Sequence, residues 1–112
     1  MKVEQKDIYL ASLNPVKGSE QAGKRPVVVV SGNAMNANMP VVIICPLSSS
    51  IKEYSGCVVL SKTKTNKLET DSEIITFQIR ALAKERLLKK VGVISDVQLR
   101  QVMTGLADVL QY

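Results

Sequence analysis

Short apolar runs rich in Val and Ile, separated by polar stretches with Pro, Gly or Asn, restrict the fold of this chain more than any other feature of its sequence. β-Branched residues pack well on a pleated surface, so each run predicts a strand. Pro26 fits the start of the strand over residues 26–30, where a missing N–H matters least. Pro46 is expected to end the strand over residues 41–45. The predicted strands cover residues 8–13, 26–30, 41–45, 57–60, 74–79 and 91–94.

The stretches between these runs predict connections rather than long helices. Residues 31–40 are rich in Asn and predict a loop. Residues 61–71 are polar and basic, and they predict a loop or an edge hairpin. Residues 81–88 predict one or two helical turns. Because helical crossovers between the early strands are missing, an all-parallel α/β sheet is not expected.

The C-terminal segment predicts one long helix. Ser95 and Gln98 have the spacing of a capping box, in which each side chain bonds the backbone amide of the other residue. We therefore expect a mainly β fold, in which short antiparallel strands form a small bent sheet or barrel and a helix follows, in one domain over residues 1–112. The buried face of the helix is predicted by apolar residues at 3.6-residue spacing, at Leu99, Val102, Met103, Leu106, Val109 and Leu110.

The absence of histidine excludes several classes of enzyme. Without His the chain has no imidazole acid or base and no His-containing zinc site, and its two cysteines are too few for an all-cysteine site. We therefore expect neither a metal nor a cofactor. The net charge of +5 fits a polyanionic partner such as nucleic acid or an acidic protein, although solubility alone explains it equally well.

The two cysteines and the apolar runs also bear on location. Cys45 and Cys57 lie in apolar surroundings with no apolar leader segment before them, which predicts buried, reduced thiols. The longest apolar run, residues 41–45, is too short to span a membrane. We expect a cytoplasmic protein without membrane contact.

The segment 18–26 gathers more reactive side chains than the rest of the chain. It holds a hydroxyl, an acid, an amide and two cations around two glycines. Arg25 directly precedes Pro26, which biases its backbone toward an extended conformation at the mouth of a strand. A guanidinium on such a fixed base suits bidentate binding of a phosphate, although a solvated hairpin loop has the same composition.

Three motifs then carry a family resemblance. Residues 17–30, Lys-Gly-Ser-Glu-Gln-Ala-Gly-Lys-Arg-Pro-Val-Val-Val-Val, closely resemble the first signature of the MazF/PemK/Kid family of toxin ribonucleases, and residues 7–15 resemble the strand that opens that family. Residues 44–49 resemble the family's strand that ends in Thr or Ser. Residues 71–80 resemble its third motif, and the resemblance as a whole spans residues 7–94.

The resemblance implies a small SH3-like β-barrel with a C-terminal helix, assembled as a homodimer. Members of the family cleave single-stranded RNA without metal, and an acidic antitoxin holds them inactive. The resemblance assigns catalysis to Arg25, Ser48 and Glu20, with Ser49 and Ser50 as neighbours to which the hydroxyl role could shift. It assigns RNA contacts to Lys17, Ser19, Gln21, Lys24, Ser49, Lys52, Gln78 and Arg80. The chain departs from many relatives by having Ser rather than Thr at position 48 and Phe77 rather than an acid before Gln78, which affects base preference.

These residues suit a reaction in which the RNA supplies its own nucleophile. The 2′-OH attacks the adjacent phosphate and leaves a 2′,3′-cyclic phosphate and a 5′-OH. Arg25 would stabilise the charge on the phosphorane oxygens, and Ser48 would add a hydroxyl donor. Glu20 would be the conventional base or would read a nucleobase, whereas Arg25, which stays protonated, could act as the base only in an unusual environment.

Several of these residues also have non-catalytic alternatives. Ser48 could be a turn serine that bonds a backbone amide. Glu20 could form an ion pair with Lys24. Arg80 could form an ion pair with Asp71 or Glu73. The sequence alone leaves these alternatives open.

Two other functions compete with RNA cleavage. The first is a non-catalytic module of the same fold, such as a toxin that poisons DNA gyrase. Those relatives use a Trp near the C-terminus, which this chain lacks. The second is a degenerate relative that acts as a decoy for the antitoxin. The presence of Glu20, Arg25 and Ser48 together disfavours a decoy.

Overall fold

The structure is a computed structural model, and it describes residues 2–13 and 23–111. The strands are β1 (Asp7–Ser12), β2 (Lys24–Val29), β3 (Val41–Ser48), β4 (Val58–Leu60), β5 (Ser72–Ile74), β6 (Arg80–Ala83) and β7 (Leu87–Val93). The helices are α1 (Asn33–Asn38) and α2 (Asp96–Leu110), and single 3-10 turns lie at η1 (Thr76–Gln78) and η2 (Lys84–Arg86).

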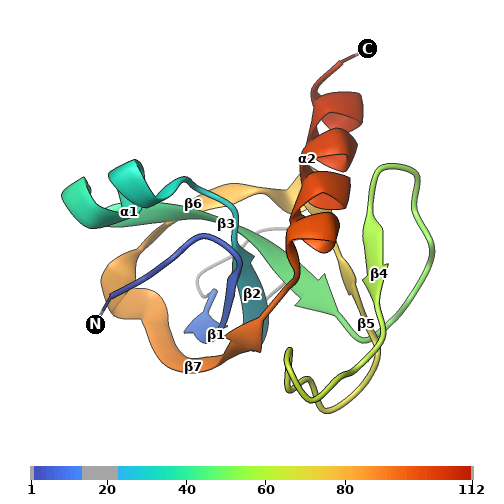
Figure 1. The fold of residues 1–112 in the computed structure, drawn as a ribbon, viewed down its shortest axis with the longest axis horizontal. Helices are drawn as coiled ribbons and strands as arrows, with labels where there is room; N and C mark the ends of the chain where they lie inside the picture. Colours follow the sequence, from blue (N-terminus) through green and yellow to red (C-terminus); the bar gives the residue numbers. More distant parts are fainter. Residues whose placement is uncertain (1, 14–22, 112) are drawn as a thin grey trace.

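The strands pair antiparallel in the order β4-β5-β3-β2-β1-β7, with β6 also on β3. The sheet bends strongly, and α2 stands beside β4 (Figure 1). The mainly β class with a C-terminal helix is confirmed. Every described strand pair is antiparallel, so the sheet is not of the parallel α/β kind, as expected. Among the described residues, the ladder is an open path that begins at β4 and ends at β7, so hydrogen bonds do not close it into a barrel.

The loop between β4 and β5 fills the space between the two ends of this path. The Val93 amide of β7 donates to the carbonyl of Thr65 at 3.4 Å. A Cβ atom at Gly92 would overlap the carbonyl oxygen of Asn66, so the loop and β7 touch backbone to backbone. The side chain of Leu68 from the same loop lies in the core. The loop therefore packs between β4 and β7, the two ends of the sheet, which do not pair with each other.

The expectation that Pro46 ends its strand is wrong, because β3 continues to Ser48. β3 changes partner at this point: its first half pairs with β6, and Leu47 and Ser48 pair with β5. The Pro46 carbonyl accepts a hydrogen bond from the Ile75 amide at 2.9 Å, between the end of β5 and η1. The N–H and C=O of one strand residue point to the same side, so the N–H that proline lacks falls where the two partner strands part.

Two further expectations are corrected. Residues 31–40 contain α1, where the buried Asn36 side chain donates to the Ser31 carbonyl at 2.9 Å. The strand predicted over 74–79 ends at Ile74, and η1 follows at Thr76–Gln78. The expectation of one or two helical turns within residues 81–88 is confirmed by the single turn η2, which lies between β6 and β7.

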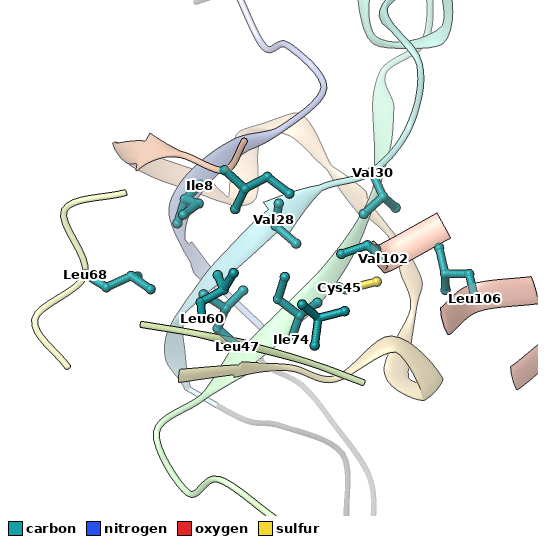
Figure 2. Packing of buried hydrophobic residues seen from close by; sticks show 12 residues of the cluster. Ile8, Val28, Val30, Cys45, Leu47, Leu60, Leu68, Ile74, Val102 and Leu106 are labelled. Carbon is teal, nitrogen blue, oxygen red and sulfur yellow. The ribbon is translucent and has the colours of Figure 1, made fainter. Parts of the chain in front are cut away.

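The core consists of two apolar clusters on opposite faces of the central strands. Figure 2 shows the first, in which Ile8, Val28 and Cys45 pack under Val102 and Leu106 of α2. The second contains Val27 and Val29, so alternate residues of β2 enter different clusters. A strand buried on both faces explains the unbroken valine run from which it was predicted. The Ser95–Gln98 capping box is also confirmed. Of the predicted buried face of α2, Val102 and Leu106 are buried and Leu99 and Val109 are half-buried, whereas the expectation is wrong for Met103 and Leu110, which are exposed.

Neither described cysteine forms a disulfide, as expected. Cys45 is fully buried, and burial raises the pKa of its thiol to about 12, with the nearby Cys57 thiol adding to the rise. Cys45 therefore stays protonated and unreactive at neutral pH. Among the described helices, none is long and apolar enough to cross a membrane.

Helix α2 meets the loop before β4 through two glycines. Gly56 has a left-handed backbone conformation (φ +84°), and its carbonyl oxygen accepts a hydrogen bond from the Thr76 hydroxyl at 2.8 Å. A Cβ atom at Gly105 would overlap that same oxygen. The close approach of helix and loop therefore requires the absence of a side chain at Gly105.

Candidate active site

Arg25 and Ser48 lie near the ends of neighbouring strands. Arg25 is the second residue of β2, is half-buried, and pairs with Ala11 of β1. Ser48 is the last residue of β3, and the paired residues of β2 and β3 end at Val27 and Pro46. If this register continued by two residues, Arg25 would lie across from Ser48, and opposite residues of antiparallel strands project from the same face at close spacing. We therefore expect these two predicted catalytic residues to be neighbours.

The Ser48 hydroxyl is partly engaged within its own turn. Its Oγ accepts a hydrogen bond from the Ser50 amide at 3.1 Å, so the turn-serine geometry is present. Its own hydroxyl lies 3.5 Å from the Ser50 carbonyl oxygen, which is a weak contact. Ser48 is 6% exposed, whereas Ser49 and Ser50 are exposed. The turn therefore holds the Ser48 Oγ beside two exposed serines.

A groove of about 680 Å³ is lined by Arg25 and Ser49 and by the apolar residues Leu10, Pro26 and Leu47. The rest of its lining, called the rim below, includes Lys67, Lys89 and Lys90 together with the acid Glu69.

Sequence reasoning missed these three lysines, which outnumber the single acid, Glu69, in the described lining. Lys89 and Lys90 are adjacent residues of β7, across from Leu10 and Tyr9 of β1. Lys90 also pairs with the buried Asp7 carboxylate at 3.2 Å. Lys67 comes from the loop between β4 and β5. The sequence shows basic residues around Lys67 and at Lys89 and Lys90, but only the fold shows that these two distant segments line the same groove.

The predicted RNA-binding residues fall into two places. Lys24 begins β2 beside Arg25 and is exposed, and Lys52 is exposed on the loop after β3. Gln78 is half-buried at the end of η1. Arg80 follows it in β6, across from Ile44, and its guanidinium donates to the Leu13 carbonyl at 3.4 Å.

The two acids proposed as partners of Arg80 are engaged elsewhere. Within the described chain, neither forms an ion pair with Arg80. Asp71 accepts a hydrogen bond from the Lys62 amide at 2.8 Å. Glu73 is fully buried and binds the loop after β3. The ion-pair alternative is therefore wrong for both acids.

Glu73 anchors the loop that follows Ser48. One carboxylate oxygen accepts from the Lys52 amide at 2.8 Å and from the Glu53 amide at 3.2 Å, and the other accepts from the Tyr54 amide at 2.9 Å. Glu73 is also the strand partner of Ser48. Bonds from three amides satisfy the buried charge and fix the loop next to the predicted catalytic hydroxyl. No sequence pattern pointed to this role.

Four predicted residues, Lys17, Ser19, Glu20 and Gln21, lie outside the described residues. The role of Glu20 as base, and its alternative ion pair with Lys24, therefore stay predictions. Among residues 2–13 and 23–111, no group of three or more Cys, Asp or Glu side chains is arranged to hold a metal ion.

Comparison with known proteins connects this arrangement to one family. Residues 4–110 match the family described as "PemK-like, MazF-like toxin of type II toxin-antitoxin system". The chain is 41% identical to "Endoribonuclease MazF" of Staphylococcus saprophyticus over 98 residues, which cover 86% of this chain and 81% of the relative.

Solved structures share the fold at lower identity. A crystal structure of MazF from Deinococcus radiodurans superposes with a TM-score of 0.85 at 23% identity, over 98% of this chain and 97% of that one. A mycobacterial endoribonuclease, solved in complex with its cognate antitoxin, superposes with a TM-score of 0.79 at 20% identity, over 98% of both chains.

Proposed function

The chain belongs to the PemK-like, MazF-like family of toxins of type II toxin–antitoxin systems, and we propose that it is a toxin endoribonuclease that cleaves single-stranded RNA at Arg25 and Ser48. The observation that supports the site assignment is the register of β2 and β3, which would set Arg25 across from Ser48 if it continued two residues beyond Val27 and Pro46. The 41% identity to an endoribonuclease across most of both chains supports the reaction class. We treat residues 1–112 as one toxin domain, in line with the match over residues 4–110.

The proposed reaction is attack by the 2′-OH on the adjacent phosphate, with the 5′-oxygen as leaving group. The products are a 2′,3′-cyclic phosphate and a 5′-OH end. The Arg25 guanidinium donates to the phosphorane oxygens as their charge develops, and the Ser48 hydroxyl donates to another of them. A carboxylate is the appropriate base for the 2′-OH proton, and Glu20 is our candidate.

The remaining predicted residues would hold the strand on either side of this phosphate. Cations bind the phosphate backbone and make affinity fall with salt, whereas amides and hydroxyls can bond base edges. We assign the first role to Lys17, Lys24, Lys52 and Arg80. We assign the second to Ser19, Gln21, Ser49 and Gln78.

The purified protein is expected to cut single-stranded RNA in the presence of EDTA, because the chain has no histidine and the mechanism uses only its own donors. The matched control is the same oligonucleotide with one 2′-deoxy nucleotide at the cleavage point, which should be inert. Mapping of fragment ends gives both the yield and the cleaved sequence. Cleavage that needs added divalent metal, or that proceeds at the 2′-deoxy position, would contradict the mechanism.

We propose that two copies of the chain form a homodimer and that an acidic antitoxin binds and inactivates it. The net charge of +5 favours an acidic partner. Exposed apolar side chains such as Met39, Val97 and Leu110 are available for contacts between chains. Sedimentation at micromolar concentration should give the mass of two chains, and the mass of one chain would contradict the dimer. The RNA substrate places the protein in the cytoplasm in this proposal.

A toxin that acts on DNA gyrase by contact alone is not favoured. The chain has no Trp at its C-terminus or elsewhere, and its relative at 41% identity is an endoribonuclease. A decoy would not need Arg25 and Ser48 in register. Both alternatives would give a protein that leaves RNA intact in the EDTA experiment.

A further inference from the structure

We propose that Tyr54 and Phe77 form a stacking platform for one nucleobase of the RNA that flanks the cleaved phosphate. This inference rests on the proposed function and adds a determinant of substrate binding to it. The pair is called the aromatic platform below. Its argument depends on exposure, rigidity and position.

The two rings are left in solvent although the chain is poor in aromatic residues. Their centroids lie 5.2 Å apart at an interplanar angle of 84°, an edge-to-face contact. Tyr54 is 46% exposed and Phe77 is 47% exposed, whereas Tyr9, the remaining aromatic residue that the structure describes, is buried. Since aromatic side chains contribute strongly to small cores, two exposed rings in contact indicate a binding surface.

Hydrogen bonds hold the backbone under both rings. The Tyr54 amide donates to Glu73 at 2.9 Å, and its carbonyl accepts from the Cys57 amide at 3.0 Å. Phe77 is the middle residue of η1, whose Thr76 hydroxyl donates to the Gly56 carbonyl at 2.8 Å. The platform is therefore ordered before RNA arrives, which reduces the entropy lost on binding.

The platform lies next to the candidate active site. Tyr54 is held by Glu73, and Glu73 is the strand partner of Ser48. On the other side, Phe77 follows Ile75, whose amide donates to the Pro46 carbonyl two residues before Ser48. Each ring is thus linked to the end of β3 through one intermediate residue, Tyr54 through Glu73 and Phe77 through Ile75. We therefore expect a base next to a phosphate at Ser48 to reach the rings.

The chemistry of the platform suits a base of single-stranded nucleic acid. Unpaired bases stack on exposed aromatic side chains, and every base offers a face for this contact. The exposed Lys52 on the same loop supplies a cation for the adjoining phosphate. The platform should therefore strengthen binding of a flanking nucleotide whatever its base, and base choice would come from other contacts.

The test is an abasic scan of a cleavable RNA sequence, made resistant by one 2′-deoxy nucleotide at the cleavage point. Binding is measured by fluorescence anisotropy for the wild type, Tyr54→Ala, Phe77→Ala and Tyr54→Phe. Leu88→Ala is the matched control, because Leu88 is also 46% exposed but lies on β7. Circular dichroism checks folding, which half-exposed side chains should not affect.

We expect one abasic position near the cleavage point to weaken wild-type binding by about 5- to 100-fold. Tyr54→Ala and Phe77→Ala should weaken binding of the intact RNA comparably and remove the further loss at that abasic position. Tyr54→Phe and Leu88→Ala should behave as the wild type. If the wild type binds every abasic RNA as tightly as the intact RNA, this result alone overturns the proposal.

Two further results separate the platform from other possibilities. Alanine variants that lose affinity for the acidic antitoxin but bind RNA normally would assign the rings to a protein partner and overturn the platform. Wild type that cleaves RNA while its scan is flat would overturn the platform and leave the proposed function intact. Wild type that binds at one base-dependent position without cutting would support the platform and contradict the nuclease.

Discussion

Arg25→Ala is expected to slow RNA cleavage by about 10²–10³-fold while leaving the fold intact, because it removes a preorganised donor to the developing charge of the phosphorane. The side chain stands half-buried near the start of β2 and belongs to neither apolar cluster, so its truncation should spare the core. Arg25→Lys should fail nearly as badly, since an ammonium keeps the charge and loses the bidentate geometry. The measurement is fragment yield per unit time on one defined RNA.

The serines at the end of β3 provide the comparison for this experiment. Ser48→Ala should reduce the rate less than Arg25→Ala, and Ser48→Thr should retain activity because it keeps the hydroxyl. Ser49→Ala distinguishes the two serines, since Ser49 is exposed beside Arg25 while Ser48 is turned into its own loop. A folded Arg25→Ala protein that cuts near the wild-type rate would contradict the site assignment.

Gly105→Ala is expected to lower the free energy of unfolding, against the usual effect of alanine in a helix. Helix propensity alone would favour alanine over glycine by about 1 kcal/mol. Here the added Cβ would overlap the Gly56 carbonyl oxygen, which is backbone and already bonded to Thr76, so α2 must shift away from the loop. Overpacking of this kind costs about 1–3 kcal/mol, and a clash with backbone lies at the upper end. The net effect is destabilising.

Urea denaturation followed by circular dichroism measures this change. Thr104→Ala is the matched control, because it puts an alanine at the preceding, exposed position of the same helix and should change stability by less than about 0.5 kcal/mol. An increase in stability for Gly105→Ala would show that helix and loop do not approach as closely as described.

Much of the fold was predictable because local pattern and tertiary structure agree. The valine run of β2 indicates a strand buried on both faces, and the spacing of apolar residues around Val102 indicates a helix with one buried face. The expectations that were wrong, a loop over residues 31–40 and a strand end at Pro46, depended on contacts that a local sequence pattern does not show. Helix α1 has Asn36 as its one buried residue and depends on its hydrogen bonds, and Pro46 stays within β3 because its partner strands change there. Neither effect has a local sequence signature.

The candidate site was predictable where its residues lie within short motifs. Arg25 and the serines at the end of β3 were predicted from two such segments and their resemblance to a family. Glu73 could not be predicted, because the amides that it binds belong to residues about twenty positions earlier in the chain. The lysine rim was missed for a similar reason, since Lys67 meets Lys89 and Lys90 only after the sheet has formed.

The position of β3 at the centre of the sheet has a consequence for the timing of toxicity. Three strands pair with β3, and two of them, β5 and β6, leave the ribosome only after Ser48 has been made. Helix α2, which covers the first cluster, is synthesised last. A nascent chain therefore lacks a formed site until nearly all of it has emerged. Synthesis of the toxin should thus finish before the new copy can attack the message that encodes it.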